Sequence, residues 1–170
     1  MSDKFETSKA SGPHYQLSRL EGEWAGIAKT WFEPGKPPSD ESPVKGNMKL
    51  VLGGRFLLHE YTGSMQGNPL EGMAIIGYQL SLGKYQVAWV DSFHNGTSIM
   101  FSEGERNAPK LNVTGSYVHV TPEKEHYWGW RTELEIVNDD EVVFTSYNVP
   151  PPGEGQEEKA TELVYKRVKQ

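Results

Sequence analysis

The absences in this sequence are informative. It has no cysteine, which excludes disulfides, thiolate metal ligands and a cysteine nucleophile. Basic charge is scarce and scattered, with 17 Lys and Arg against 23 Asp and Glu and a net charge of −6, which argues against nucleic-acid binding. No apolar run reaches the roughly 18–20 residues of a membrane helix, and the first residues lack the apolar core of a signal peptide. We therefore expect a cytoplasmic protein with neither a nucleic-acid nor a membrane partner.

The common catalytic and cofactor motifs are also missing. There is no HExxH sequence and no close histidine pair, so a metal site would have to assemble from separate strands. The chain has no G-x-S-x-G nucleophile motif, no Walker loop and no G-x-G-x-x-G. We expect neither a metal nor a cofactor.

Aromatic residues and alternating polarity are what the sequence does contain. Aromatics make up 11% of 170 residues, a length typical of one domain. Residues 1–12 are polar and are expected to form a disordered tail, with a single domain over 13–170. Pro13 and the leucines that follow predict one short helix that ends at Gly22.

Beyond that helix, apolar residues recur with period two, and turn residues interrupt them every eight to twelve positions or so. This pattern predicts about ten strands joined by short turns, which is an antiparallel meander. Closing such a meander into a barrel hides its edges and leaves room for an internal cavity. The expected strands are 23–33, 43–52, 55–63, 70–80, 84–93, 97–103, 109–120, 126–137, 141–149 and 159–168.

The alternation also assigns residues to the two faces of each strand. In 84–93, Tyr85, Trp89 and Asp91 lie on the same face of the strand. Because this face is the aromatic one, we expect it to point inward. In 109–120, Tyr117 and His119 share the dry face. These assignments place a carboxylate and a histidine inside the barrel.

The stretch 55–63 places His59, Glu60 and Tyr61 side by side. Arg55 and His59 share one face, and we take their polarity to mark the solvent side, which points Glu60 inward. In 126–137, periodicity puts Trp130 inside and Arg131 outside. Arg131 is retained as a candidate because it can pair with an inward carboxylate.

Two features resemble known families. Gly22-Glu23-Trp24, followed late in the chain by Tyr165 and Arg167, is similar to the first-strand motif of calycin barrels, the lipocalins and fatty-acid-binding proteins. In that superfamily the Trp closes the barrel floor and a basic residue of the last strand packs across it. Haem-binding relatives ligate through a late histidine, which this chain lacks.

A closer resemblance covers His14 to Arg167. The series PHYQLSRLEGEW, LGGRFLLHEYTG, PLEGMAIIGY, KYQVAWVDS and TELVYKR is similar to the bacterial domain-of-unknown-function family 1579. The resemblance implies a calycin-like barrel and leaves activity open. The family pattern maps onto Gly54, Arg55, Phe56, Glu60, Tyr61, Gly63, Gly72, Gly77, Tyr78, Trp89, Asp91 and Arg131.

Three functions are compatible with these observations. The leading one is a barrel, monomeric or homodimeric, that binds a small, partly apolar ligand in its cavity. The second is an enzyme that uses Glu60, Asp91 and His119 in acid–base chemistry. The third is an interaction or structural barrel with a filled core, in which the same polar groups only hold the wall. The candidate ligand-binding residues are Glu60, Tyr78, Tyr85, Trp89, Asp91, Tyr117, His119, Trp130 and Arg131.

Overall fold

The computed structural model describes residues 2–169. These residues form two helices and ten strands, and the strands alternate in polarity as the sequence predicts. The elements are α1 (Ser2–Ser11), α2 (Pro13–Ser18), β1 (Gly22–Thr30), β2 (Asp40–Val51), β3 (Phe56–Met65), β4 (Asn68–Gln79), β5 (Lys84–Asp91), β6 (Met100–Gly104), β7 (Asn112–Val120), β8 (Glu125–Asn138), β9 (Glu141–Val149) and β10 (Glu158–Arg167).

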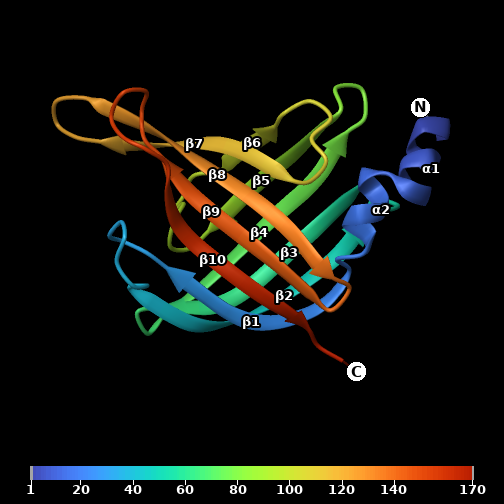
Figure 1. Cartoon of the computed structure of the whole chain (residues 1–170), viewed down its shortest axis with the longest axis horizontal. Coiled ribbons are helices and arrows are strands. Elements are labelled where there is room, and N and C mark those ends of the chain that lie inside the picture. Colours follow the sequence, from blue (N-terminus) through green and yellow to red (C-terminus); the bar gives the residue numbers. More distant parts are fainter. Residues whose placement is uncertain (1, 170) are drawn as a thin grey trace.

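The ten strands close into one antiparallel barrel (Figure 1). Each strand pairs with its neighbours in chain order, and β1 pairs with β10 from Trp24↔Arg167 to Thr30↔Thr161 to complete the ring. Closure leaves no unpaired sheet edge, which is the physical reason that a meander of this length curls up. The predicted all-β, closed calycin-like barrel is confirmed.

The N-terminal segment differs from the sequence expectation. The tail predicted to be disordered over 1–12 instead forms α1, with Met1 outside the described residues, as Gln170 is at the other end. Ser8 Oγ lies 2.8 Å from His14 Nδ1, and the Phe5 ring meets the His14 ring edge-on. Arg55 of the β2–β3 turn lies over Phe5. The segment is mostly polar, and only a few of its residues make packing contacts. Its composition therefore gave no sign that it would fold as a helix.

The predicted short helix is present as α2 and covers one end of the barrel. Leu17 and Leu20 are buried there, and Trp24 Nε1 donates a hydrogen bond to the Leu20 carbonyl at 2.8 Å. Arg167 lies over the Trp24 ring at 4.2 Å. This is the contact between the first and last strands that the calycin resemblance implies.

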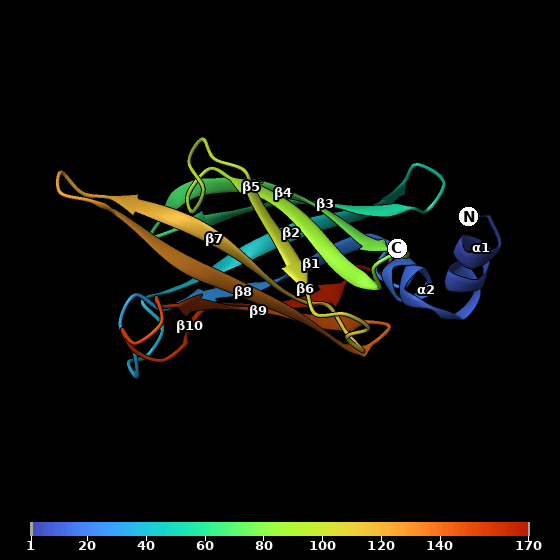
Figure 2. The same cartoon turned by 90° about the horizontal axis from the view of Figure 1, so that it is seen from above.

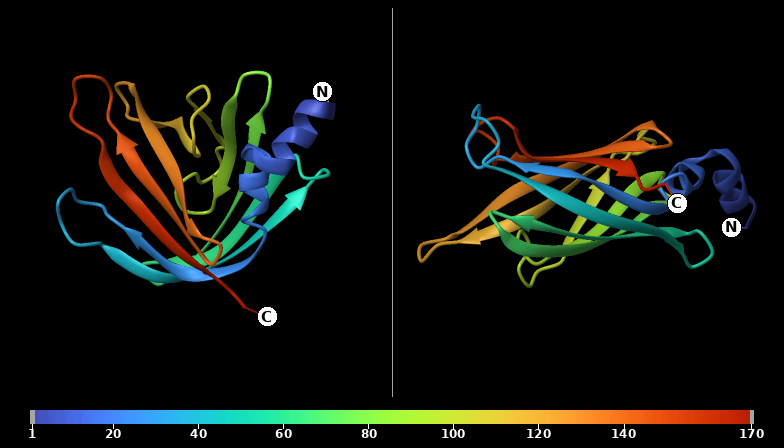
Figure 3. Two further views of the ribbon diagram at one scale, coloured as in Figure 1. Left: turned by 45° about the vertical axis from the view of Figure 1, so that its right-hand side comes forward. Right: turned by 90° about the horizontal axis from the view of Figure 1, so that it is seen from below.

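The two ends of the barrel are built differently. The helices lie at one end, while the β7–β8 hairpin projects beyond the other (Figure 2). The β1–β2 and β9–β10 loops lie close together at that second end (Figures 2 and 3). In an antiparallel barrel the β3–β4 and β5–β6 connections must lie there too. Neither described helix is long and apolar enough to cross a membrane.

Candidate functional site

Inside the barrel, toward the end opposite α2, lies a partly open cavity of about 150 Å³. Strands from both sides of the barrel contribute to its wall, together with His94 of the β5–β6 loop. Most of the lining is apolar, and the apolar members include Val44, Met65, Leu70, Ala74, Ile76, Val87, Trp89, Val113, Trp130, Phe144 and Leu163. A concave, mostly apolar space with a few polar groups is typical of a ligand site.

Asp91, the last residue of β5, organises the polar side of this cavity. Its Oδ1 accepts backbone N–H groups from Phe93 at 3.0 Å, from Asn95 at 3.1 Å and from His94. Its Oδ2 accepts the Tyr61 hydroxyl at 3.1 Å and lies 2.6 Å from His94 Nδ1. Burial raises the pKa of Asp91, but the hydrogen bonds and the charge of His94 outweigh burial and hold the pKa below its ordinary value. Asp91 is therefore an ionised, fully partnered carboxylate.

His94 is a cavity-lining residue that the sequence analysis did not select. Its ring lines the cavity, with ring centroids 5.5 Å from Trp89 and 5.7 Å from Trp130. Nδ1 faces Asp91, whereas Nε2 is buried and finds no hydrogen-bond partner among residues 2–169. A buried polar atom without a partner is costly, and because protein atoms cover Nε2, neither water nor a ligand reaches it in this conformation. The signal available in the sequence was the i, i+3 spacing of Asp91 and His94 around a turn.

Tyr61 reaches Asp91 across the strand that separates them. Cross-strand register aligns Tyr61 of β3 with Gly72 of β4, and Gly72 with Asp91 of β5. A Cβ on Gly72 would clash with the Tyr61 hydroxyl and lie 2.7 Å from the Cβ of Asp91, so only glycine leaves room for the bond. Trp89 Nε1 donates to the Tyr61 hydroxyl at 2.8 Å. Burial and the charge of Asp91 raise the pKa of Tyr61, which keeps it a neutral donor.

A second inward pair lies deeper in the barrel. His59 Nε2 and the Tyr165 hydroxyl are 3.1 Å apart, and the His59 ring stacks on Phe144 at 5.5 Å. A Cβ on Gly46 would lie 3.1 Å from His59 Nε2 and clash with Tyr165, so this glycine again makes the space. Burial lowers the pKa of His59 from 6.5 to about 4, so the ring is neutral near pH 7.

The predicted faces of β3 were therefore reversed. His59 is 5% exposed and points inward with Leu57 and Tyr61, while Glu60 is exposed on the outside. The assignment relied on Arg55, which precedes the strand and lies in the turn between β2 and β3. The alternation of strand faces does not apply to a residue in a turn.

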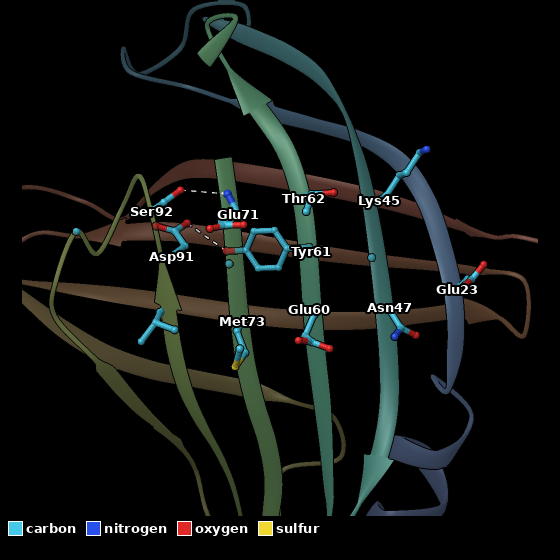
Figure 4. A pocket seen from close by; sticks show the side chains of 14 residues that line it. Glu23, Lys45, Asn47, Glu60, Tyr61, Thr62, Glu71, Met73, Asp91 and Ser92 are labelled. Atoms are coloured by element: carbon cyan, nitrogen blue, oxygen red, sulfur yellow. Dashed lines mark hydrogen bonds between the residues drawn. The ribbon is translucent and has the colours of Figure 1, made fainter. Parts of the chain in front are cut away.

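Glu60 instead belongs to an open groove of about 730 Å³ on the outer surface of β1–β5. Figure 4 shows it beside Asn47 and Met73, with Tyr61 turned toward Asp91. This groove is larger than the internal cavity, but its polar side chains are exposed to solvent and no enclosed apolar wall surrounds them. We therefore take the internal cavity as the candidate site.

The other predicted residues divide between the cavity and its surroundings. Trp89, Asp91 and Trp130 line the cavity, as expected from their faces, and the Trp89 and Trp130 rings stack with centroids 5.6 Å apart. Tyr78 and Tyr85 pack against each other in the core nearer α2. Burial raises the pKa of Tyr85 to about 12.

Three predicted contacts lie outside the cavity. Tyr117 points inward but its hydroxyl bonds Asn148 at 2.9 Å. His119 keeps the predicted strand parity, yet it is exposed because the β7–β8 hairpin extends past the barrel. Arg131 lies outside, paired with Glu157 at 2.6 Å, so it does not neutralise an internal carboxylate. Residues 2–169 contain no cluster of three or more His, Cys, Asp or Glu side chains placed to hold a metal ion.

Fold and site define a calycin-like barrel with a small internal cavity. The chain belongs to the family described as "Protein of unknown function (DUF1579)", whose model matches residues 9–167. The fold is similar to that of an S-type phycobiliprotein lyase from Guillardia theta, with a TM-score of 0.50, 10% sequence identity and 92% of each chain covered. None of the curated proteins compared with this chain matches it.

Proposed function

We propose that this protein binds a small, partly apolar ligand inside the barrel. The observation that carries the proposal is the internal cavity, which has mostly apolar walls and the Asp91–His94 pair at one side. An apolar wall favours a ligand that leaves water, and a few fixed polar groups orient it. The likeness to a phycobiliprotein lyase supports the barrel fold and is compatible with a binding role.

The volume limits the size of the ligand. Drug-sized ligands occupy roughly 300–1,000 Å³, whereas an apolar cavity near 150 Å³ accepts a molecule about as large as benzene. The barrel cavity, at about 150 Å³, is of the second kind. A ligand of one ring, or an aliphatic of similar size, is what the barrel holds without opening.

The alternatives from the sequence have lost part of their support. Of the three groups proposed for acid–base chemistry, Asp91 lines the cavity, while Glu60 and His119 are exposed outside it. A barrel that only serves as a structural or interaction module does not need the cavity. The structural alternative predicts no saturable small-molecule binding that depends on cavity volume. The enzyme alternative predicts such binding together with turnover that Asp91→Asn abolishes.

The test is a thermal-shift screen of monocyclic compounds, combined with native mass spectrometry of the purified protein. A ligand present at 100 times its dissociation constant stabilises a protein by about 2.7 kcal/mol, which raises the melting temperature of a chain this size by roughly 5–11 °C. Ala74→Leu fills the cavity because Ala74 lines it. Ala88→Leu is the matched control, because Ala88 lies on the neighbouring strand β5 and does not line the cavity.

Ligand-dependent stabilisation that Ala74→Leu abolishes and Ala88→Leu retains supports the proposal. If no monocyclic compound stabilises the wild-type protein and no bound mass is found, the binding function is wrong. Stabilisation that survives in Ala74→Leu would place the binding site elsewhere, with the outer groove around Glu60 as the next place to test.

A further inference from the structure

We propose that the cavity selects a neutral, single-ring compound that carries a hydrogen-bond acceptor, and that this acceptor binds an N–H group at Nδ1 of His59. This inference rests on the proposed binding function and adds the chemical class of the ligand. Nδ1 is the free nitrogen of a ring that lines the cavity, and the Tyr165 hydroxyl occupies the other nitrogen. The single ring follows from the cavity volume of about 150 Å³.

The free nitrogen of His59 is accessible from the cavity. His59 points inward and lines the cavity, with its ring against those of Phe144 and Tyr61. Nε2 lies 3.1 Å from the Tyr165 hydroxyl, whereas Nδ1 makes no hydrogen bond with residues 2–169. Protein atoms do not seal Nδ1 off, because Nε2 of His94 is the one buried side-chain polar atom without a partner in this part of the chain. A ligand in the cavity therefore meets one free ring nitrogen.

Tyr165 decides which nitrogen of His59 carries the proton. Burial lowers the pKa of His59 to about 4, so near pH 7 the ring is neutral and has a single N–H. A proton on Nε2 would be donated to the Tyr165 oxygen, and the phenolic O–H would then have no acceptor in a residue that is 0% exposed. A proton on Nδ1 lets the Tyr165 hydroxyl donate to Nε2, and the remaining N–H faces the cavity. The second arrangement leaves no buried donor unpaired once a ligand accepts from Nδ1.

The other polar groups of the wall do not impose a direction. The Thr132 and Ser146 hydroxyls lie 3.0 Å from each other, and a hydroxyl of this kind both donates and accepts. The Tyr61 hydroxyl already donates to Asp91 and accepts from Trp89. Discrimination between an acceptor ligand and a donor ligand therefore depends on His59.

The charge of the ligand follows from the rest of the wall. Asp91 and Glu162 line the cavity, and no Lys or Arg of residues 2–169 does. His94 Nδ1 faces Asp91 at 2.6 Å, so any charge on that ring is already paired. An anion would lose its hydration here without a free counter-charge, and a cation has no lone pair to offer Nδ1. A neutral acceptor meets the N–H without either cost.

The first experiment compares pyridine, benzene and pyrrole by isothermal titration calorimetry at neutral pH, where all three are uncharged. Pyridine only accepts a hydrogen bond, pyrrole only donates one, and benzene does neither. Benzene in the cavity leaves the Nδ1 proton unpaired, so pyridine should bind the wild-type protein about tenfold more tightly than benzene. Pyrrole should bind no more tightly than benzene, because it loses its hydration without finding an acceptor at Nδ1.

The second experiment removes the donor. His59→Leu should bind pyridine no more tightly than benzene, because pyridine then loses its hydration without a partner. His119→Leu is the matched control, since His119 is exposed on the β7–β8 hairpin, and it should keep the preference for pyridine.

The third experiment releases the proton with Tyr165→Phe, which also serves if His59→Leu does not fold. Without the phenolic hydroxyl, either nitrogen of His59 can carry the proton. This variant should still prefer pyridine over benzene, and it should gain a preference for pyrrole over benzene of up to about tenfold. A purely structural role of Tyr165 would weaken all three ligands alike. Tyr117→Phe, an inward tyrosine bonded to Asn148, is the control and should keep the wild-type order.

The outcomes separate this inference from the proposed function. Equal binding of pyridine and benzene by the wild-type protein would overturn the role of Nδ1 and leave the binding function intact. A pyridine preference that persists in His59→Leu would do the same. A wild-type preference for pyrrole, or an unchanged order in Tyr165→Phe, would overturn the assigned position of the proton. If none of the three compounds binds, both the inference and the single-ring binding function fail.

Discussion

His59 should make the stability of this barrel fall in weak acid. The folded state holds the pKa of His59 at about 4 because burial disfavours the charged ring, against an ordinary value of 6.5. As the pH falls below about 6.5, the unfolded chain takes up this proton before the folded chain does. The stabilisation is therefore complete above about pH 6.5 and is lost progressively toward about pH 4.

The size of this loss follows from the two pKa values. The gap between 6.5 and about 4 corresponds to about 3 kcal/mol in the free energy of unfolding. Between about pH 7.5 and about pH 4.5, His59 alone should account for about 2.5 kcal/mol. This is a large share of the 5–15 kcal/mol that typically stabilises a domain.

The assay is urea unfolding at these two pH values, followed by tryptophan fluorescence. His59→Gln removes the titrating ring, so the variant should lose about 2.5 kcal/mol less than the wild-type protein as the pH is lowered. His14, whose pKa burial also lowers, contributes equally to both proteins and cancels in the comparison. His119→Gln, an exposed position, is the control and should follow the wild type. Equal losses in wild type and His59→Gln would refute the reasoning.

Three further substitutions test other parts of the structure. Gly72→Ala introduces a Cβ where Tyr61 crosses to Asp91, and should lower the free energy of unfolding by about 1–3 kcal/mol in urea titrations; an unchanged value would contradict the close packing. Glu60→Gln alters the outer groove only, so calorimetry should find an unchanged affinity for a cavity ligand from the thermal-shift screen, whereas a loss would return Glu60 to the site. Arg167→Lys removes a guanidinium that donates to three backbone carbonyls, and should lower the melting temperature by roughly 4–8 °C. No shift would show that the contact between the first and last strands contributes little.

Local patterns were sufficient for most of the fold. Period-two polarity and turn residues located the ten strands to within a few residues, and the β9 prediction of 141–149 agrees with the structure. Pro13 correctly marked the start of α2. These features are readable from sequence because strand alternation and turn chemistry involve only residues close in the chain. The exception was α1, whose contacts to His14 and Arg55 are few and partly remote.

The candidate site was only partly readable. The inward faces of Trp89, Asp91 and Trp130 were predicted correctly, because the aromatic face of a strand generally points to the core. His94 was missed because it lies in the β5–β6 loop, where no periodicity applies. The Asp91 carboxylate, by accepting consecutive backbone N–H groups, folds that loop back over the cavity.

The sequence by itself determined that side chains of β3 alternate between two faces, which separates Glu60 from His59. Which face turns inward was decided by the tertiary structure. Gly46 and Gly72 lie on the neighbouring strands in register with this stretch, and their missing side chains give His59 and Tyr61 room inside the barrel. Alternation is a property of one strand, whereas that room depends on the register between strands. The partners of each polar group follow from the same register.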